Sequence, residues 1–353
     1  METKKKDFLV RLINEPGPSG FEEKVQKIWK TEVSSFCRNI KGDVHGNLTA
    51  TLNPDEEFSI MIVGHSDEIG LVINYVDDNG FIYFYSIGGV DASILGSQRA
   101  RIITKNGIIE GVFGQKSLHQ EDGGKRSVPK RYEVFIDIGA KSKAEVLKQV
   151  TIGDPVIFGN DYRDLRNNLA ASRCFDNRIG IFIVAETLRK LSNKKFKTKV
   201  FGVSSVQEEI NTGGAGNAAY YLNPTMAIAI DVMPATDYPG VSQTQFGDCK
   251  LGSGPVIRRG VRTNKRIADK MLEVAKKKKY KYQIDMDNGR FGTDSDYIAP
   301  IRSGIPVGGI EVATRYLHSC EEVLSLKDLD ESVNYMTDLI LEIDKDKNFL
   351  RKE

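Results

Sequence analysis

The spacing of apolar residues changes twice along this chain of 353 residues, and this change constrains the fold more than any other feature. Before about residue 72 and after about residue 164, short apolar runs alternate with segments whose apolar residues recur every three or four positions, a pattern typical of strands alternating with helices. Between these limits, short β-rich runs follow one another and are separated by turns such as Asp77-Asp78-Asn79-Gly80. The pattern predicts an α/β fold that is interrupted by an all-β module.

Residues 1–71 and 165–353 are therefore expected to form one domain, a mixed sheet with helices on both faces, and residues 72–164 an inserted β-rich domain. Helices are predicted over residues 21–37, over 177–192 and from about Leu326, and buried strands over 58–64, 198–205, 226–231 and 306–311. Residues 115–131 are expected to form an exposed loop, in which His119 is a solvated histidine and not a ligand.

Composition and charge exclude several classes of protein. The chain has 50 basic and 48 acidic residues, which gives no bias towards polyanions such as nucleic acids. Its longest apolar stretch, around Ile179 to Ala185, is far shorter than the roughly 20 residues of a membrane span, and no export signal precedes the first amphipathic segment. The four cysteines are scattered and form no Cys-x-x-Cys pair, which favours reduced thiols. We expect a soluble, cytoplasmic protein that binds neither nucleic acid nor membranes.

Residues that commonly bind metals lie where predicted strands end or predicted helices begin. In open α/β sheets such places converge on one crevice outside the carboxyl ends of the strands, even when they are distant in sequence. The candidate ligands, two histidines and three carboxylates, are His65, Asp176, Glu209, Asp231 and His318.

Each of these residues also has an ordinary structural explanation. Asp176 taken alone is read as a helix N-cap, and His65 as a histidine whose hydrogen bonds are satisfied in the core. The combination favours a metal site, because two of only four histidines lie in such segments beside carboxylates. Two imidazoles, three carboxylates and one bridging hydroxide would also balance the charge of two divalent cations. Ligands of this kind suit Zn²⁺, which we expect first, and equally Co²⁺ or Mn²⁺.

The adjacent residues Glu208 and Glu209 are expected to have different roles. If Glu209 binds a metal, its neighbour is free to face the attacking water, whose proton a carboxylate within hydrogen-bond reach can accept. Glu208 is therefore the candidate general base. Asp67, two positions after His65, is placed to accept the second imidazole N–H and fix its tautomer, although a surface aspartate is the alternative reading.

Five segments, in order, closely resemble the M42 metallo-aminopeptidase family, which includes glutamyl aminopeptidases, deblocking aminopeptidases and the TET peptidases. The resemblance runs nearly from end to end. It rests on Pro16-Gly17-Pro18-Ser19-Gly20-Phe21-Glu22, Gly64-His65-Ser66-Asp67-Glu68-Ile69-Gly70, Asp176-Asn177-Arg178, Val206-Gln207-Glu208-Glu209 and Thr314-Arg315-Tyr316-Leu317-His318-Ser319.

The resemblance implies an aminopeptidase that acts on short peptides with two divalent metal ions per subunit. It implies that Asp176 bridges the ions, that His65 and Asp231 complete one site, and that Glu209 and His318 complete the other. It also implies Glu208 as the base and Asp67 as the catalytic aspartate behind His65. Residues 72–164 would be a PDZ-like barrel used in assembly, and the subunits would form dimers that often build shells of twelve.

Two departures from the family pattern concern the neighbourhood of these residues. Ser66 stands where the family usually has methionine, and Ile210-Asn211-Thr212-Gly213-Gly214 replaces the usual Val-Gly-Leu-Arg-Gly. A homologue that binds metal but has lost catalysis is therefore one alternative. Some relatives are named endoglucanases, so a metal-free glycoside hydrolase is the other, although a single tryptophan provides few of the aromatic platforms such enzymes need.

The sequence also offers candidates for recognising the first side chain of a substrate. Four arginines, Arg258, Arg259, Arg290 and Arg315, would suit an acidic side chain, and a surface or structural role is the alternative for each.

Overall fold

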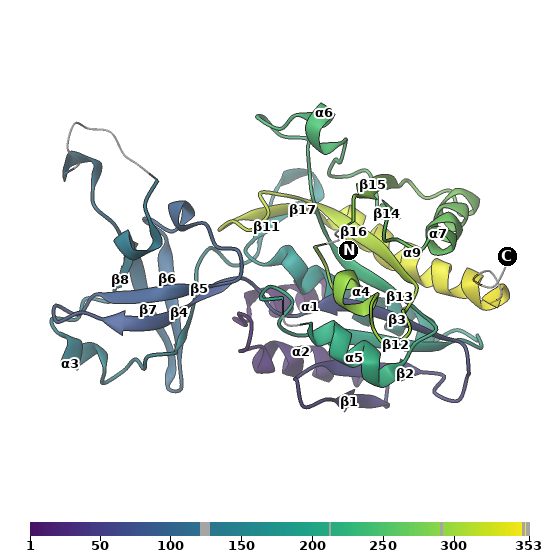
Figure 1. Ribbon diagram of the computed structural model, residues 1–353, viewed down its shortest axis with the longest axis horizontal. Helices are drawn as coiled ribbons and strands as arrows, with labels where there is room; N and C mark the ends of the chain where they lie inside the picture. The colour runs from purple at the N-terminus through teal and green to yellow at the C-terminus, as the bar shows by residue number, and fades with distance from the viewer. Residues whose placement is uncertain (121–127, 212, 290–291, 348–349, 351–353) are drawn as a thin grey trace.

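A large mixed sheet forms the main body of the protein in the computed structural model (Figure 1). The structure describes all residues except 121–127, 212, 290–291, 348–349 and 351–353. In order across the sheet, its strands are β1 (Ile40–Gly42), β2 (Leu48–Leu52), β12 (Lys199–Ser205), β3 (Ser59–His65), β13 (Met226–Pro234), β16 (Val307–Arg315), β17 (Glu322–Ser325), β11 (Leu169–Ser172) and β10 (Arg163–Asp164), with β14 (Val256–Gly260) pairing to β16 and to β15 (Gln283–Asp287). The four central strands β12, β3, β13 and β16 are parallel, so their carboxyl ends lie at the same edge.

Helices cover both faces of this sheet because the central strands are apolar on both sides. In β3, Ile60 and Ile62 belong to one hydrophobic cluster, whereas Met61 and Val63 belong to another. The larger cluster includes residues of α1 (Thr3–Asn14), α2 (Glu23–Val33), α4 (Phe175–Ser192), α7 (Lys265–Lys277) and α9 (Leu326–Lys345). The smaller cluster includes residues of α5 (Gly214–Leu222) and α8 (Ser295–Ile298), and a short helix α6 (Gln243–Phe246) lies outside both.

Strand β3 and helix α4 approach each other unusually closely near the carboxyl end of the strand. A Cβ atom added to Gly64 would lie 2.5 Å from the carbonyl carbon and 2.7 Å from the Cα atom of Gly180. Both neighbours are backbone atoms, so no side chain can move aside to make room. The absence of a side chain at position 64 therefore sets the distance between His65 and the start of α4.

The predicted β-rich module is a closed barrel of six antiparallel strands beside the main body (Figure 1). Around the barrel the strands are β4 (Gly70–Val76), β5 (Ile82–Ile87), β8 (Phe135–Asp137), β7 (Gly107–Gly114), β6 (Arg99–Thr104) and β9 (Pro155–Ile157), and α3 (Lys143–Val146) precedes the last of them. The barrel has its own core, which includes Phe84, Ile102 and Ile136. The predicted fold class, a mixed α/β sheet with an inserted all-β barrel, is confirmed.

Some local expectations change in detail. The strand predicted over residues 226–231 continues to Pro234, so Asp231 lies inside β13 and not at its end. His119 lies exposed in a short 3₁₀ helix, and part of the predicted 115–131 loop falls outside the described residues. Within the described residues, no helix has both the length and the apolar character needed to cross a membrane.

Candidate metal centre

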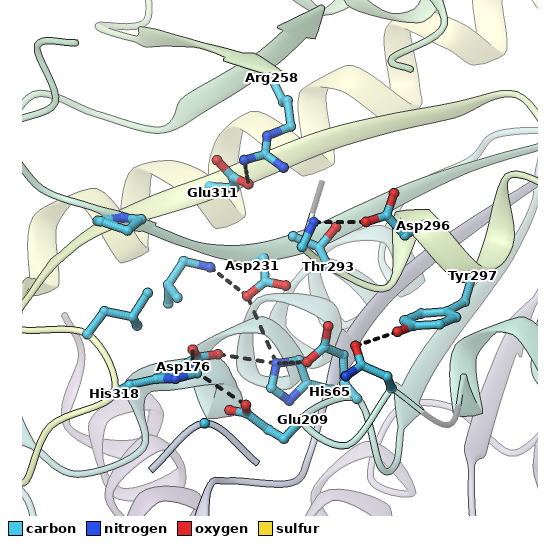
Figure 2. Close-up of a pocket in the computed structure, with 17 residues that line it drawn as sticks. His65, Asp176, Glu209, Asp231, Arg258, Thr293, Asp296, Tyr297, Glu311 and His318 are labelled. Carbon is cyan, nitrogen blue, oxygen red and sulfur yellow. Dashed lines mark hydrogen bonds and ion pairs between the residues drawn. The ribbon is translucent and has the colours of Figure 1, made fainter. Parts of the chain in front are cut away.

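A cavity of about 460 Å³ opens at the carboxyl ends of the central parallel strands (Figure 2). Its lining includes all five predicted metal ligands and the predicted base: His65, Asp176, Glu208, Glu209, Asp231 and His318. These residues come from five separate segments of the chain, so the fold brings together what the sequence separates. The residues at the predicted strand ends therefore converge on one cavity, as expected from the sequence.

The register of the sheet places several of these side chains in one row. Ser205 of β12 pairs with His65 of β3, and Asp231 of β13 pairs with Glu311 of β16. Strands β3 and β13 pair at Val63 and Ala229, so two residues further along each strand bring His65 level with Asp231. Although Asp231 lies inside its strand, it therefore faces the same part of the cavity as the histidine that ends the neighbouring strand.

Asp176 reaches the cavity because a different residue caps helix α4. The backbone of Asp176 is extended (φ −74°, ψ 111°), and the side-chain Oδ1 of Asn177 accepts the backbone N–H of Gly180 at 2.9 Å, as a capping residue does. The side-chain Nδ2 of Asn177 also donates to the carbonyl of Ile230 at 2.7 Å, which ties the start of α4 to β13. The carboxylate of Asp176 is thereby free to face the two histidines.

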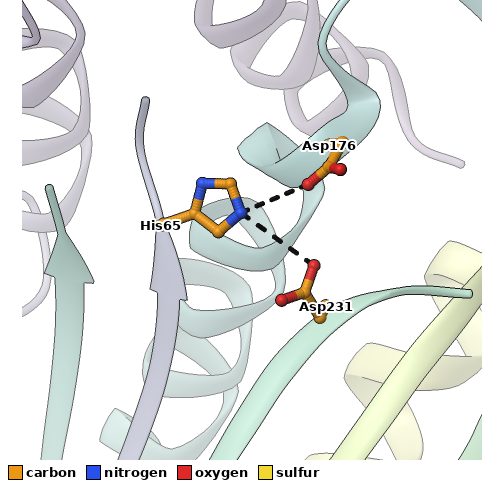
Figure 3. Close-up of side chains that lie close together, drawn as sticks. All are labelled: His65, Asp176 and Asp231. Atoms are coloured by element: carbon orange, nitrogen blue, oxygen red, sulfur yellow. Dashed lines mark ion pairs between the residues drawn. The ribbon is translucent and has the colours of Figure 1, made fainter. Parts of the chain in front are cut away.

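His65, Asp176 and Asp231 form a first group of candidate ligands (Figure 3). The Nε2 atom of His65 lies 3.2 Å from Oδ1 of Asp176 and 4.0 Å from Oδ1 of Asp231. All three residues are buried, and one ligand atom of each lies within 4.8 Å of the others. This spacing suits ligands that surround one ion.

Asp176, Glu209 and His318 form a second group on the other side of Asp176. The Nε2 atom of His318 lies 3.2 Å from Oδ2 of Asp176 and 3.4 Å from Oε2 of Glu209. The two groups therefore share one carboxylate, which turns a different oxygen atom towards each histidine. A shared carboxylate of this kind can bridge two ions.

The negative charges of Asp176, Glu209 and Asp231 repel one another. Burial raises the pKa of Glu209 and of Asp231 well above the usual range, and the charge of Asp176 raises both further. Burial acts on Asp176 in the same direction, but the neighbouring imidazoles of His318 and His65 outweigh it and hold the pKa of Asp176 below its usual value. Added positive charge would allow all three groups to ionise together.

The donor set also fits divalent metals. In the described part of the chain, Oδ1 of Asp176 and Oε1 of Glu209 are buried without a hydrogen-bond partner. Imidazole and carboxylate ligands suit Zn²⁺, Co²⁺ and Mn²⁺. The nearby thiol of Cys174 does not add to them, because burial raises its pKa to about 12 and keeps it protonated.

The predicted base and the predicted aspartate behind His65 both lie at the first group. Oε2 of Glu208 is 3.7 Å from Nε2 of His65, and burial raises the pKa of Glu208 to about 8, against the effect of His65 and with that of Asp294. Oδ1 of the fully buried Asp67 lies 3.3 Å from Nδ1 of His65, on the side of the ring away from the cavity ligands. Glu208 and Glu209 thus point to different groups.

The acidic residues near the centre that the sequence analysis missed include Glu311 and Asp294. Glu311 lines the cavity, and burial raises its pKa to about 8, although Arg258 lowers it. Asp294 is buried and accepts the hydroxyl of Ser205 at 2.6 Å. A charged residue inside the apolar run 305–313 was a signal for Glu311, whereas nothing in the sequence near Asp294 marks it.

The four arginines considered for substrate recognition lie in different surroundings. Only Arg258 among the described three lines the cavity, where its Nη2 atom lies 3.1 Å from both Asp285 and Glu311. Arg315 forms a two-pronged ion pair with Asp237, and Arg259 is exposed. Arg290 lies outside the described residues.

The altered segment after Glu209 contributes directly to the cavity wall. Asn211 lines the cavity, and its Oδ1 atom accepts the hydroxyl of Tyr297 at 2.6 Å. Thr212 lies outside the described residues. The departure from the family pattern therefore changes the wall of the cavity and leaves the candidate ligands in place.

Comparisons with known proteins agree with the resemblance. The chain is 28% identical over 347 residues to the lysyl aminopeptidase of Pyrococcus furiosus, covering 96% of this chain and 97% of that protein. Its structure is similar to an aminopeptidase of the archaeon Desulfurococcus kamchatkensis (TM-score 0.89, 34% identity, 96% and 95% of the two chains). It is also similar to the TET1 peptidase of Pyrococcus horikoshii, which can assemble into a tetrahedron or a large octahedral shell (TM-score 0.85, 31% identity, 95% and 98%).

The family model of M42 glutamyl aminopeptidases matches residues 46–335, a range that contains every candidate ligand of both groups and Glu208. The match covers well over half of the chain. The protein therefore belongs to the M42 glutamyl aminopeptidase family of peptide hydrolases.

Proposed function

We propose that this protein removes the first residue from peptides with the help of two divalent metal ions. One observation carries the proposal. The two oxygens of Asp176 lie 3.2 Å from the Nε2 atoms of His65 and His318, each of which belongs to a separate ligand group. A carboxylate shared in this way favours two neighbouring ions over one.

In this proposal His65 and Asp231 complete one site, and Glu209 and His318 complete the other. When bound, two divalent ions polarise the scissile carbonyl and lower the pKa of the attacking water. Zn²⁺ is the ion we expect first, and Co²⁺ or Mn²⁺ would suit the same ligands.

Glu208 is the proposed general base, which takes a proton from the attacking water and passes it to the leaving amine. Its carboxylate lines the cavity beside the first ligand group, with its side chain only 12% exposed. Burial raises the pKa of Glu208, which makes its carboxylate a stronger base than one in water. A group whose pKa lies near the working pH can hold the proton between the two transfers.

Asp67 is proposed to orient His65. A carboxylate on Nδ1 holds the imidazole in the tautomer whose Nε2 lone pair faces Asp176 and Asp231. Because the His65 ring and Asp67 are both buried, neither side chain has room to turn away from the other.

We further propose that the subunits assemble, with a dimer as the building block and a shell of twelve as one outcome, and that the barrel of residues 70–157 takes part. The similar TET1 peptidase of Pyrococcus horikoshii assembles into a tetrahedron or an octahedral shell, which supports this proposal. Light scattering coupled to size exclusion would give the mass in solution, and a monomer at micromolar concentration would contradict it.

Activity towards aminoacyl p-nitroanilides after removal and return of metal tests the main proposal. Chelation should abolish turnover, and Zn²⁺, Co²⁺ or Mn²⁺ should restore it. Glu208→Gln should lower kcat by about 10²–10⁴-fold, the usual contribution of a general base, while two metal ions per chain remain bound. Near-normal turnover in this variant with full metal content would show that another group is the base.

The same experiments separate the alternatives. A homologue impaired by the altered wall at Asn211 would bind two ions and yet hydrolyse none of the anilides. A glycoside hydrolase would hydrolyse glucan after chelation, because two carboxylates suffice for that reaction without metal.

A further inference from the structure

The backbone turn at residues 207–209 lies beside the two ligand groups, and each of its three amides donates a hydrogen bond to a carboxylate. The N–H of Gln207 donates to Oε1 of Glu22 at 3.1 Å, and the N–H groups of Glu208 and Glu209 donate to Oδ1 and Oδ2 of Asp67, each at 3.1 Å. Two carboxylates therefore hold three successive amides. The orientation of this turn decides where the side chains of Glu208 and Glu209 point.

The turn needs such support because its backbone is strained. Gln207 has a φ of +60°, in the left-handed region that a residue with a side chain seldom occupies. Residues keep such conformations only where their surroundings hold them. The hydrogen bond to Glu22 is made by the amide of this strained residue.

Glu22 belongs to the segment 16–22, which the sequence analysis recognised without assigning a role to it. Its Oε1 atom also accepts the N–H of Gly20 at 2.9 Å, and Ser19 of the same segment donates its hydroxyl to Oδ2 of Asp67 at 2.7 Å. The segment thus contacts both carboxylates that hold the turn. It joins Glu22, Asp67 and Gln207 into one hydrogen-bonded unit.

The segment is itself fixed to the core. The N–H of Gly17 donates to Oε1 of the buried Glu68 at 3.0 Å, and the completely buried Arg178 donates to the same oxygen at 3.0 Å. A side chain at position 17 has no room, because a Cβ atom would lie 2.8 Å from Val25 and 2.9 Å from Arg178. Because the segment is held rigidly by the core, it can hold the turn in a fixed position.

The position of Glu22 is unfavourable for an ionised carboxylate. Its side chain is 5% exposed, and burial together with the charge of Asp67 raises its pKa to about 7. Burying a carboxylate beside another carboxylate destabilises the folded state unless both accept hydrogen bonds. One of the two bonds that Glu22 accepts comes from the first amide of the turn, that of Gln207, and the other comes from Gly20.

We propose that Glu22 is a positioning residue which, through the amide of Gln207, sets the place of the Glu208 carboxylate. This inference rests on the proposed role of Glu208 as general base. Asp67 holds the next two amides, so Glu22 fixes the start of the turn and Asp67 fixes its continuation. Glu22 does not line the cavity and has no contact with the reacting groups.

Glu22→Ala and Glu22→Gln in the metal-loaded protein test this proposal, with Asp328→Ala as the matched control. Asp328 is also a completely buried carboxylate that accepts two backbone amides, those of Gly252 at 2.6 Å and Gly254 at 2.9 Å, but it does not line the cavity. Loss of either carboxylate removes comparable hydrogen bonds. Of these two residues, Glu22 and not Asp328 holds the turn beside the candidate ligands.

Glu22→Ala should lower kcat by about 10–100-fold with KM changed less than threefold, because a displacement of about 1 Å in a reacting group has an effect of this size. Two metal ions per chain should remain bound. Glu22→Gln retains an acceptor oxygen and should stay within about fivefold of the unaltered protein. Asp328→Ala should lower Tm and leave kcat unchanged.

Amide hydrogen exchange over residues 203–211 gives a readout that does not depend on activity. Exchange there should rise in Glu22→Ala and remain normal in Asp328→Ala. Unchanged exchange and kcat in Glu22→Ala, or a loss of kcat that follows loss of metal, would overturn the positioning role while leaving the aminopeptidase proposal intact. If the unaltered protein hydrolyses no anilide, the proposed function fails, and the exchange data still decide whether Glu22 holds the turn.

Discussion

Replacing Gly64 with alanine tests whether the close approach of β3 and α4 sets the geometry of the metal centre. The new Cβ atom would lie 2.5 Å from the carbonyl carbon of Gly180, and ordinary contact begins at 3.4 Å, so strand and helix must separate by about 0.9 Å. Overpacking of this kind costs about 1–3 kcal/mol, which corresponds to a fall in Tm of about 1–4 °C for a chain of this length.

The effect on activity should be larger than the effect on stability. His65 follows Gly64 directly, and Asp176 lies at the start of the displaced helix, so their separation of 3.2 Å should increase. A displacement near 1 Å lowers turnover by about 10²-fold. We expect Gly64→Ala to bind metal more weakly and to lose activity by that order, measured by kcat at saturating metal and by metal titration.

Gly42→Ala in strand β1 is the matched control. A Cβ atom there would meet the end of the flexible Leu48 side chain at 3.3 Å and the carbonyl oxygen of Asn47 at 3.7 Å, an ordinary contact distance, so activity and metal binding should be unchanged. If Gly64→Ala lost stability but kept the metal affinity and kcat of the unaltered protein, the close approach would not determine the position of the ligands.

Three further predictions concern the metal centre and its surroundings. His318→Ala should bind one metal ion firmly in place of two, because His318 belongs to only one ligand group, and equal loss of both ions on elemental analysis would contradict the division. Removal of metal should lower Tm, since ions that bind only the folded state stabilise it by mass action, and a Tm unaffected by chelator would refute this. The pKa of Glu311 is raised to about 8 in the folded state, so the folded protein holds this proton more tightly than the unfolded chain does. The stability gained in this way is complete below the ordinary pKa of about 4.5 and is lost as the pH rises through 8. Glu311→Gln should therefore flatten the fall of Tm between pH 5 and pH 8, and parallel curves for the two proteins would count against this origin.

The sequence predicted the main architecture, and it predicted candidate site residues that the structure brings together in one cavity, because both depend on local patterns. The apolar run before His65 reads as a strand buried on both faces, and that is how β3 is packed. His65 was recognisable because it stands where such a pattern stops, and Asp176 because it stands where a helical pattern begins. The roles of these residues as ligands remain predictions until metal binding is measured.

What the sequence did not show depends on contacts between distant residues. Glu311 lies beside Asp231 only because β13 and β16 are paired in one register. Glu22 reaches Gln207 across 185 positions, and no local spacing marks that contact. The extent of β13 was also misjudged, because its residues beyond Asp231 continue the strand without a change in apolar pattern that would reveal where pairing stops.

The barrel also shapes how the protein can fold, because its first and last strands are neighbours. Leu71 of β4 pairs with Val156 of β9, so the chain leaves the main body and returns to it at almost the same point. His65 and Asp176 are 111 positions apart, and once the barrel has closed the effective loop between them shortens to about 26 residues. By the logarithmic dependence of loop entropy on length, this shortening lowers the entropic cost of joining the two ligands by about 1 kcal/mol. A barrel that forms early would thus hold the two ends of this loop close together and favour formation of the first ligand group.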